Sequence, residues 1–315
     1  MHLVTYLAGR TARLGAVWRD TLLDLRALSI DMAAQRTKRP RGEALLPGTM
    51  LELIDGGPAL WARAQEIWDY GRKLVDRLDP ADLRRRGVAR PLARARLLAP
   101  VPRPRKNVFC MGRNYAEHAA ERGAAPPERP VFFTKPPTAV VGPGAPVVHH
   151  AATQALDYEV ELAVVVGRPG RDLTPEAALR HVFGYTIVND VTARDLQKAH
   201  QQWFKGKALD TFCPMGPALV TADEVPDPQA LGIRLRVNGQ LRQEATTGQM
   251  IFDVATLLAV LSLGLTLEPG DILATGTPSG VGAATGAYLK PGDVMEAEID
   301  GLGCLRNPVV APGDR

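Results

Sequence analysis

Two glutamates inside an apolar segment offer the clearest chemistry in this chain of 315 residues. Glu159 and Glu161 alternate with apolar residues in DYEVELAVVV, residues 157–166. On a strand both side chains would point to one face, about 7 Å apart along the chain. The AVVV run predicts a buried strand, where two carboxylates repel each other and lose hydration unless a cation lies between them. The alternative is an edge strand whose glutamates face water, which alternation by itself favours.

A third carboxylate follows the next strand-like segment, GYTIVND, which ends at Asp190. Together with the two glutamates, Asp190 would complete a set of oxygen ligands, which suits Mg²⁺, Mn²⁺ or Ca²⁺ better than zinc. The alternative role for Asp190 is an N-cap of the helix expected from Thr192 onward. Asp195 falls in the first turn of that helix, where its negative charge interacts favourably with the helix dipole.

A second group of polar residues lies in NYAEHAAE, residues 114–121. His118 and Glu121 are three residues apart, so on a helix they share a face and can touch. A carboxylate beside an imidazole fixes its tautomer, raises its basicity and can help it to orient a water molecule. The alternative is an ordinary exposed pair, since such helical pairs are common. Gly112 and Gly123 flank the helix and would let it move as a lid.

Two further donors follow glycines, namely Lys207 in GK and Thr277 in GTPSG. Glycine permits a ligand to approach the backbone closely. The second segment is not a phosphate-binding loop of the Walker type, because no lysine follows its last glycine. The alternatives are a surface lysine and a turn threonine.

The elements that must position these residues form a strand-rich α+β pattern. The Asn238-Gly239 pair between two extended runs predicts a hairpin, because both residues tolerate positive φ. Strands are predicted at residues 108–111, 131–134, 158–166, 185–188, 233–237, 271–275 and 294–299. Helices are predicted at residues 115–122, 175–182, 192–203 and 252–263, and earlier at 21–34 and 59–78. We expect a small N-terminal α/β domain at residues 1–80, a connector at 81–106 and a catalytic domain at 107–315.

Composition and charge narrow the class of protein. Hydrophobic residues make up 45% of the chain and charged residues 23%, which is typical of globular proteins. No apolar run approaches the roughly 18–20 residues of a membrane span, and the first residues lack a signal-type apolar core. The three cysteines form no CxxC pair, which favours a reducing compartment, so we expect a cytoplasmic protein without a membrane partner. The connector is rich in arginine but has no interleaved aromatics, which argues against nucleic-acid binding.

Several motifs together resemble the fumarylacetoacetate hydrolase superfamily. They run in family order from about residue 107 to the end of the chain, and the first residues are similar to the small N-terminal domain of longer members. The matching segments are GRNYAEHAAE, FFTKPPTAVVGPG, LDYEVELAVVVG, GYTIVNDVTARDLQ, QWFKGKALDTFCPMGP, VNGQLRQ, MIFDVATLLAVLS and PGDILATGTPSGVG.

The resemblance implies a mixed β-roll, a site for Mg²⁺ or Mn²⁺ and a homodimer. By motif, Glu159, Glu161 and Asp190 match the metal ligands. His118 and Glu121 match the catalytic dyad of the lid, and Lys207 matches the catalytic lysine. The positions that match the substrate pocket are Arg113, Tyr158, Arg194, Gln197 and Thr277.

One departure from the family bears on the reaction. Met111 stands where the fumarylacetoacetate hydrolases themselves carry a further metal-binding aspartate. This points to 2-oxo acids other than fumarylacetoacetate, and we expect metal-dependent C–C hydrolysis of an acylpyruvate through an enolate. The alternatives are oxaloacetate decarboxylation or tautomerisation, or isomerisation of 2-hydroxyhepta-2,4-diene-1,7-dioate. A non-catalytic binding module on the same scaffold is the alternative from another class.

Overall fold

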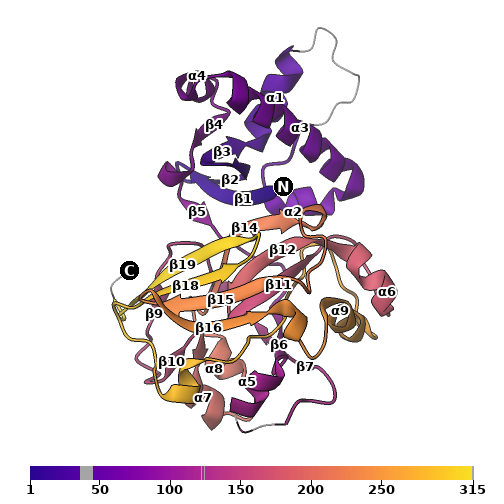
Figure 1. The fold of residues 1–315 in the computed structure, drawn as a ribbon. Coiled ribbons are helices and arrows are strands. Elements are labelled where there is room, and N and C mark those ends of the chain that lie inside the picture. The colour runs from indigo at the N-terminus through magenta and orange to yellow at the C-terminus, as the bar shows by residue number, and fades with distance from the viewer. Residues whose placement is uncertain (36–44, 122, 124, 314–315) are drawn as a thin grey trace.

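The computed structural model describes residues 1–35, 45–121, 123 and 125–313, and it consists of strands with helices at their edges (Figure 1). The strand-rich α+β class expected from the sequence is confirmed. No described helix combines the length and apolar character that crossing a bilayer requires.

The N-terminal part is a small sheet covered by helices (Figure 1). Its elements are β1 (His2–Ala8), β2 (Thr11–Trp18), β3 (Thr21–Asp24), α1 (Leu25–Gln35), α2 (Met50–Asp55), α3 (Gly57–Arg77), α4 (Pro80–Arg85), β4 (Ala89–Pro91) and β5 (Leu97–Leu98). Helix α3 buries Ala64, Ile67, Trp68 and Gly71, whose spacing of three or four residues makes one apolar face. It closely matches the helix predicted at 59–78.

The helix predicted at 21–34 begins later than expected. Residues 21–24 form β3, which pairs with β2, and the Asp24 carboxylate accepts a hydrogen bond from the Ala27 amide at 2.8 Å. This local cap ends the strand and starts α1 at Leu25. The prediction failed for these four residues because strand pairing outweighs their helical pattern.

A single large sheet runs from the N-terminal strands into the region that carries the predicted site. Its main path is β4-β3-β2-β1-β14-β12-β11-β17-β6-β7, and β1 joins the two parts by pairing with β14. The later strands are β6 (Val108–Gly112), β7 (Val131–Lys135), β8 (Val140–Val141), β11 (Val160–Val166), β12 (Val182–Asn189), β14 (Cys213–Thr221) and β17 (Ile272–Ala274). Strand β11 lies between β12 and β17, so the edge-strand alternative for the two glutamates is wrong.

A second sheet packs beside the first. Its order is β16 (Gln240–Thr246), β15 (Gly232–Val237), β18 (Val294–Ile299), β19 (Gly303–Val310) and β9 (Val147–Val148). The hairpin between β15 and β16 is confirmed, with φ of +53° at Asn238 and +76° at Gly239. Alternate residues of β15 and β18 are buried and contribute to one hydrophobic core.

Short helices surround the mouth of the predicted site. They are α5 (Ala116–Glu121), α7 (Arg194–Ala199), α8 (Phe204–Lys207) and α10 (Gly282–Thr285), while α6 (Pro175–Ala178) and α9 (Val254–Ser262) pack together farther away. Arg122, the predicted end of the first of these helices, lies outside the described residues. The helix predicted at 175–182 gives way to a 3₁₀ turn at Leu179–His181.

The helix predicted at 192–203 is divided. Residues 192–193 form β13 (Thr192–Ala193), which pairs with β10 (Leu156–Asp157), and the helix stops at Ala199. The Arg194 amide continues this contact by donating to the Ala155 carbonyl at 2.9 Å. A bridge between segments far apart in the chain therefore replaces the first helical turn.

Strand β11 contributes to two hydrophobic cores. Val160, Leu162 and Val164 belong to the core beneath the second sheet, whereas Ala163 and Val165 belong to a core shared with the N-terminal helices and strands. This burial on both faces explains the continuous apolar run in the sequence. Within the expected connector, β4 pairs with β3 and β5 with β1, and the domain boundaries themselves stay a prediction.

Candidate functional site

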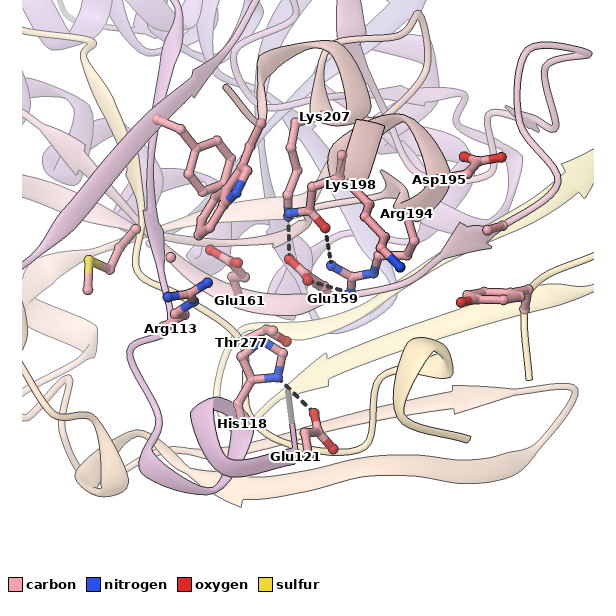
Figure 2. A pocket seen from close by; sticks show the side chains of 17 residues that line it. Arg113, His118, Glu121, Glu159, Glu161, Arg194, Asp195, Lys198, Lys207 and Thr277 are labelled. Carbon is pink, nitrogen blue, oxygen red and sulfur yellow. Dashed lines mark hydrogen bonds and ion pairs between the residues drawn. The ribbon is translucent and has the colours of Figure 1, made fainter. Parts of the chain in front are cut away.

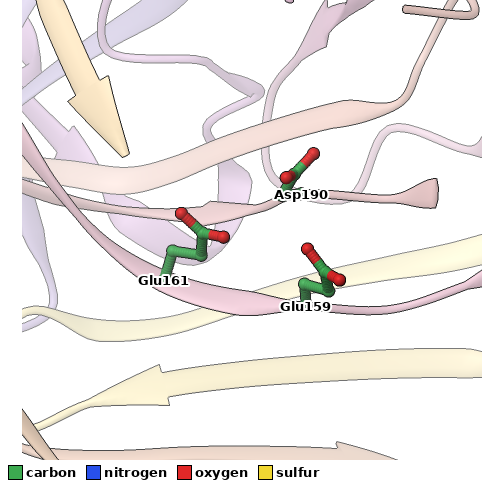
Figure 3. Close-up of side chains that lie close together, drawn as sticks. All are labelled: Glu159, Glu161 and Asp190. Atoms are coloured by element: carbon green, nitrogen blue, oxygen red, sulfur yellow. The ribbon is translucent and has the colours of Figure 1, made fainter. Parts of the chain in front are cut away.

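Three buried carboxylates converge at the start of β11 and the end of β12 (Figure 3). One oxygen from each of Glu159, Glu161 and Asp190 lies within 4.8 Å of the others. The antiparallel register sets Val160 opposite Asn189, so the residues on either side meet across the strand pair. The sequence placed Glu159 on the strand, but the strand begins at Val160, and the Asn189 side-chain oxygen holds the Glu159 amide at 2.9 Å.

Buried cations compensate two of these three carboxylates. The Lys207 ammonium lies 2.6 Å from Glu159 Oε2 and 2.6 Å from Asp190 Oδ2. Lys135 approaches the other Asp190 oxygen at 2.5 Å, and the Arg194 guanidinium pairs with Glu159 at 2.6 Å and Asp157 at 2.8 Å. Burial would raise the pKa of Glu159, but Arg194 and Lys207 outweigh it and hold this pKa below its ordinary value.

Glu161 is the uncompensated member of the group. Within the described part of the chain no cationic side chain pairs with it, and its Oε2 accepts the Gly276 amide at 2.8 Å. Burial, followed by the nearby charges of Asp190 and Glu159, raises the pKa of Glu161 well above its ordinary value.

A count of charges tests whether a metal ion would fit here. The buried carboxylates are Asp157, Glu159, Glu161 and Asp190, and the buried cations beside them are Lys135, Arg194 and Lys207. If all four carboxylates are ionised, one negative charge is left over, and Glu161 is the carboxylate of this group without a cationic partner among the described residues. Hard divalent cations prefer such ligands, so the donor set fits Mg²⁺ or Mn²⁺.

His118 and Glu121 face these carboxylates from α5. His118 Nδ1 lies 2.8 Å from Glu121 Oε1, and the Gly280 amide donates to Glu121 Oε2 at 2.9 Å. Burial would raise the pKa of Glu121, but the hydrogen bonds from His118 and Gly280 lower it below its ordinary value. An ionised Glu121 can only accept a hydrogen bond, so the His118 Nδ1–H donates to it and Nε2 is left as the acceptor.

A cavity of about 540 Å³ brings the two groups together. The predicted residues that line it are Arg113, His118, Glu121, Glu159, Glu161, Arg194, Gln197, Lys207 and Thr277. We call Glu159, Glu161 and Asp190 the sheet wall, and Arg113, His118 and Glu121 the helix wall. Figure 2 shows His118 across from the carboxylates, Arg113 to their left in the same view, and Lys198 beside Arg194 on the right.

Asp190 and Tyr158 are placed differently from the other predicted residues. Asp190 is fully buried behind the lining, where its carboxylate contacts Lys207 and Lys135. Tyr158 is buried as well, and its hydroxyl donates to the Gly280 carbonyl at 3.2 Å. Tyr158 therefore supports the loop that holds Glu121 and does not line the cavity.

The remaining predicted positions have defined contacts. Thr277 Oγ1 accepts a hydrogen bond from Gln243 at 2.8 Å, and Gln197 accepts one from Arg194 at 3.1 Å. Asp190 is not the cap of α7, whose N-cap position is Ala193. Asp195 in the first turn accepts bonds from the Thr153 hydroxyl at 2.6 Å and the Gln154 amide at 2.8 Å.

Sequence reasoning missed Lys135, Asp157 and Trp203. Lys135 ends the strand VFFTK, and a lysine closing an apolar strand is a signal that could have indicated a buried ion pair. Asp157 pairs with Arg194 and also accepts the Gly282 amide at 2.7 Å. Nothing in the sequence pattern connects Trp203 with the Gly112-Arg113 segment that it contacts.

Comparisons with known proteins identify the family of this chain. The family model for the C-terminal domain of fumarylacetoacetate (FAA) hydrolase matches residues 107–310. Oxaloacetate tautomerase YisK of Bacillus subtilis is 46% identical over 269 residues, which cover 84% of this chain and 87% of the relative.

Two solved structures share the fold along the whole chain. A fumarylacetoacetate hydrolase from Exiguobacterium antarcticum has 42% identity and a TM-score of 0.79, with 99% of each chain covered. A 2-hydroxyhepta-2,4-diene-1,7-dioate isomerase from Mycobacterium marinum has 32% identity and a TM-score of 0.71, with 100% of each chain covered. The resemblance seen in the motifs is thereby confirmed, and the chain belongs to the fumarylacetoacetate hydrolase family of enzymes.

Proposed function

We propose that this protein catalyses keto–enol tautomerisation of a small 2-oxo acid, with oxaloacetate as the first substrate to test. The observation that carries the proposal is the His118–Glu121 pair facing a buried carboxylate triad across one cavity. The similarity to an oxaloacetate tautomerase supports the alternative expected from the sequence better than it supports C–C hydrolysis.

The sheet wall would hold Mg²⁺ or Mn²⁺ through Glu159, Glu161 and Asp190. When bound, such an ion supplies Lewis-acid polarisation of the 2-oxo group. The three carboxylates are fixed before any ligand arrives, because Gly276, Arg194, Lys135 and Lys207 already contact them.

His118 would move the proton. Glu121 holds Nδ1, so Nε2 can accept a proton from the carbon next to the keto group. One proton leaves the carbon and one proton is added to the carbonyl oxygen. The enol therefore forms without gain or loss of atoms or electrons. Lys207 lines the cavity and uses two of its three N–H donors on Glu159 and Asp190, which leaves one to stabilise negative charge on that oxygen.

Hydrolysis of an acylpyruvate is the second candidate, and the same dyad favours it. A histidine oriented by a carboxylate can activate water for attack on the distal carbonyl. Tautomerisation needs only the proton transfer, whereas hydrolysis also needs a water molecule placed between His118 and the substrate. Decarboxylation of oxaloacetate requires neither step.

Ultraviolet absorbance separates these reactions. With Mg²⁺ or Mn²⁺ we expect rapid equilibration of the oxaloacetate enol without consumption of oxaloacetate, and we expect EDTA to abolish it. Metal-dependent cleavage of acylpyruvates without oxaloacetate equilibration would establish the hydrolase instead. No metal-dependent change with any substrate would favour the binding module.

Two further expectations stay predictions. The homodimer is tested by light scattering after gel filtration, and the cytoplasmic location by fractionation of the cells that produce the protein. Neither of them is needed for the chemistry above.

A further inference from the structure

Arg113 is a cation at the cavity that forms no ion pair within the described part of the chain. Lys207 and Arg194 line the same cavity, but both are paired with buried carboxylates. Among the described residues no acidic side chain pairs with Arg113. An exposed guanidinium at the mouth of a negatively charged site is therefore available to an anionic ligand.

The position of this guanidinium is fixed from both sides. It lies over the Trp203 ring, 5.4 Å from the centroid. Gly112 before it packs so tightly that a Cβ there would lie 2.3 Å from Trp203, and Asn114 after it donates to the carbonyls of Phe252 and Thr275 at 3.0 and 2.8 Å. Arg113 itself has φ of +60°, a strained conformation that persists only where the surroundings impose it.

The arrangement of the cavity indicates which part of a substrate Arg113 meets. The 2-oxo acid end belongs at the sheet wall, and the carbon that loses a proton belongs at His118. Figure 2 shows Arg113 nearer to His118 than Lys198 is, and Lys198, which also lacks an acidic partner among the described residues, lies beside Arg194. In oxaloacetate the distal carboxylate is bonded directly to the reacting carbon, so it would lie next to His118.

We propose that Arg113 binds the distal carboxylate and selects 2-oxo dicarboxylic acids over 2-oxo monocarboxylic acids. This inference rests on the proposed function and names its substrate class. A planar guanidinium can donate two parallel hydrogen bonds to a carboxylate, which an ammonium cannot reproduce. Arg113 therefore determines specificity and takes no part in proton transfer.

The test compares two substrates in the same assay, namely deuterium exchange at C3 of oxaloacetate and of 2-oxobutanoate. For Arg113→Gln we expect KM for oxaloacetate to rise about tenfold or more, since a charged hydrogen-bonded pair is lost. We expect kcat, and both constants for 2-oxobutanoate, to change less than threefold. Arg113→Lys should recover part of the lost affinity.

Arg168→Gln is the matched control. Arg168 also lies over a tryptophan, 5.9 Å from the Trp61 centroid, but it does not line the cavity. This variant should leave both substrates unchanged. An equal rise in KM for both substrates in Arg113→Gln, or a larger rise for oxaloacetate in Lys198→Gln, would overturn the assignment.

Calorimetry with unreactive analogues separates this inference from the proposed function. Malate carries the distal carboxylate and 2-hydroxybutanoate lacks it. If the wild type exchanges neither substrate, the proposed function fails, yet a loss of malate affinity alone in Arg113→Gln, with Mg²⁺ present, would still support the inference. Equal binding of both analogues by the wild type, or no binding of either, would overturn it.

Discussion

The sheet wall of the cavity comes from segments far apart in the chain, whereas the helix wall comes from one stretch of nine residues, 113–121. Asp190 and Glu161 are nearly inaccessible, and each is held by partners from other elements, such as Lys135 on β7 and the Gly276 amide. On the helix wall the side chain of Glu121 is 18% exposed and Arg113 is exposed, whereas His118 between them is buried.

This difference separates two tasks. Fixed, buried charges give a site whose electrostatic field is set before a ligand enters, which suits the binding of a cation and the stabilisation of an oxyanion. Proton transfer and substrate selection need groups that can reach the ligand, and Arg113, His118 and Glu121 of the helix wall line the cavity. Substitutions in the sheet wall should therefore change metal affinity or stability, whereas substitutions in the helix wall should change kcat or KM.

The largest effect is expected for Glu161→Gln. Of the three carboxylates, Glu161 is the one without a cationic partner among the described residues, so Mn²⁺ affinity should fall by more than about 100-fold and turnover should be lost. Calorimetric titration with Mn²⁺ and the ultraviolet assay check this, with Glu244→Gln, an exposed glutamate of β16, as the control. Unchanged Mn²⁺ affinity would remove Glu161 from the ligand set.

Lys135→Met should mainly affect stability. It leaves the fully buried Asp190 with one cation in place of two, and breaking a buried pair costs about 3–5 kcal/mol. Urea unfolding measures the change in the free energy of unfolding. Lys205→Met, on the exposed side of α8, should change it by less than about 0.5 kcal/mol. Equal urea midpoints of unfolding for the two variants would show that the ion pair of Lys135 with Asp190 does not stabilise the protein.

His118→Gln should lower kcat for tautomerisation about 100-fold, the usual contribution of a general base. The sheet wall is untouched, so Mn²⁺ affinity should stay within twofold. His181→Gln is the control, because His181 contacts the Arg168 carbonyl and does not line the cavity. A loss of Mn²⁺ affinity equal to the loss of kcat would contradict the separation of the two walls.

Glu121→Gln should have the smallest effect, about tenfold in kcat, because the residue positions His118 without touching the substrate. Glu117→Gln is the control. Glu117 lies on the same helix, is exposed, and accepts a hydrogen bond from the Ser279 hydroxyl at 3.2 Å. Stopped-flow absorbance of the oxaloacetate enol compares them. If Glu117→Gln were the slower variant, the orienting role of Glu121 would be wrong.

Local patterns in the sequence were enough for much of the fold and of the candidate site. The hairpin at Asn238-Gly239 depends on two adjacent residues, and the pair His118–Glu121 depends on one helical turn. The grouping of Glu159 with Glu161 follows from alternation, although only Glu161 lies within the strand. Asp190 joins them because two neighbouring antiparallel strands bring its end of β12 to their end of β11.

The features that could not be predicted depend on contacts between residues that are far apart in the sequence. Lys135 meets Asp190 only after β6, β17, β11 and β12 have paired, and Trp203, which precedes α8, meets Gly112 at the end of β6. The division of the helix predicted at 192–203 has the same cause, since Thr192 pairs with Asp157. Residue types and short sequence spacings do not indicate which distant segments come into contact.

The pairing of β1 with β14 has a practical consequence for anyone who wishes to prepare the C-terminal part alone. Ala163 and Val165 continue the face of β11 that carries Glu161, and they pack in the core to which Leu3 and Leu14 of the N-terminal strands belong. A fragment starting at residue 107 would expose that apolar face and free one edge of β14. Such a fragment should aggregate on expression, even though every proposed metal ligand and every proposed catalytic group lies within it.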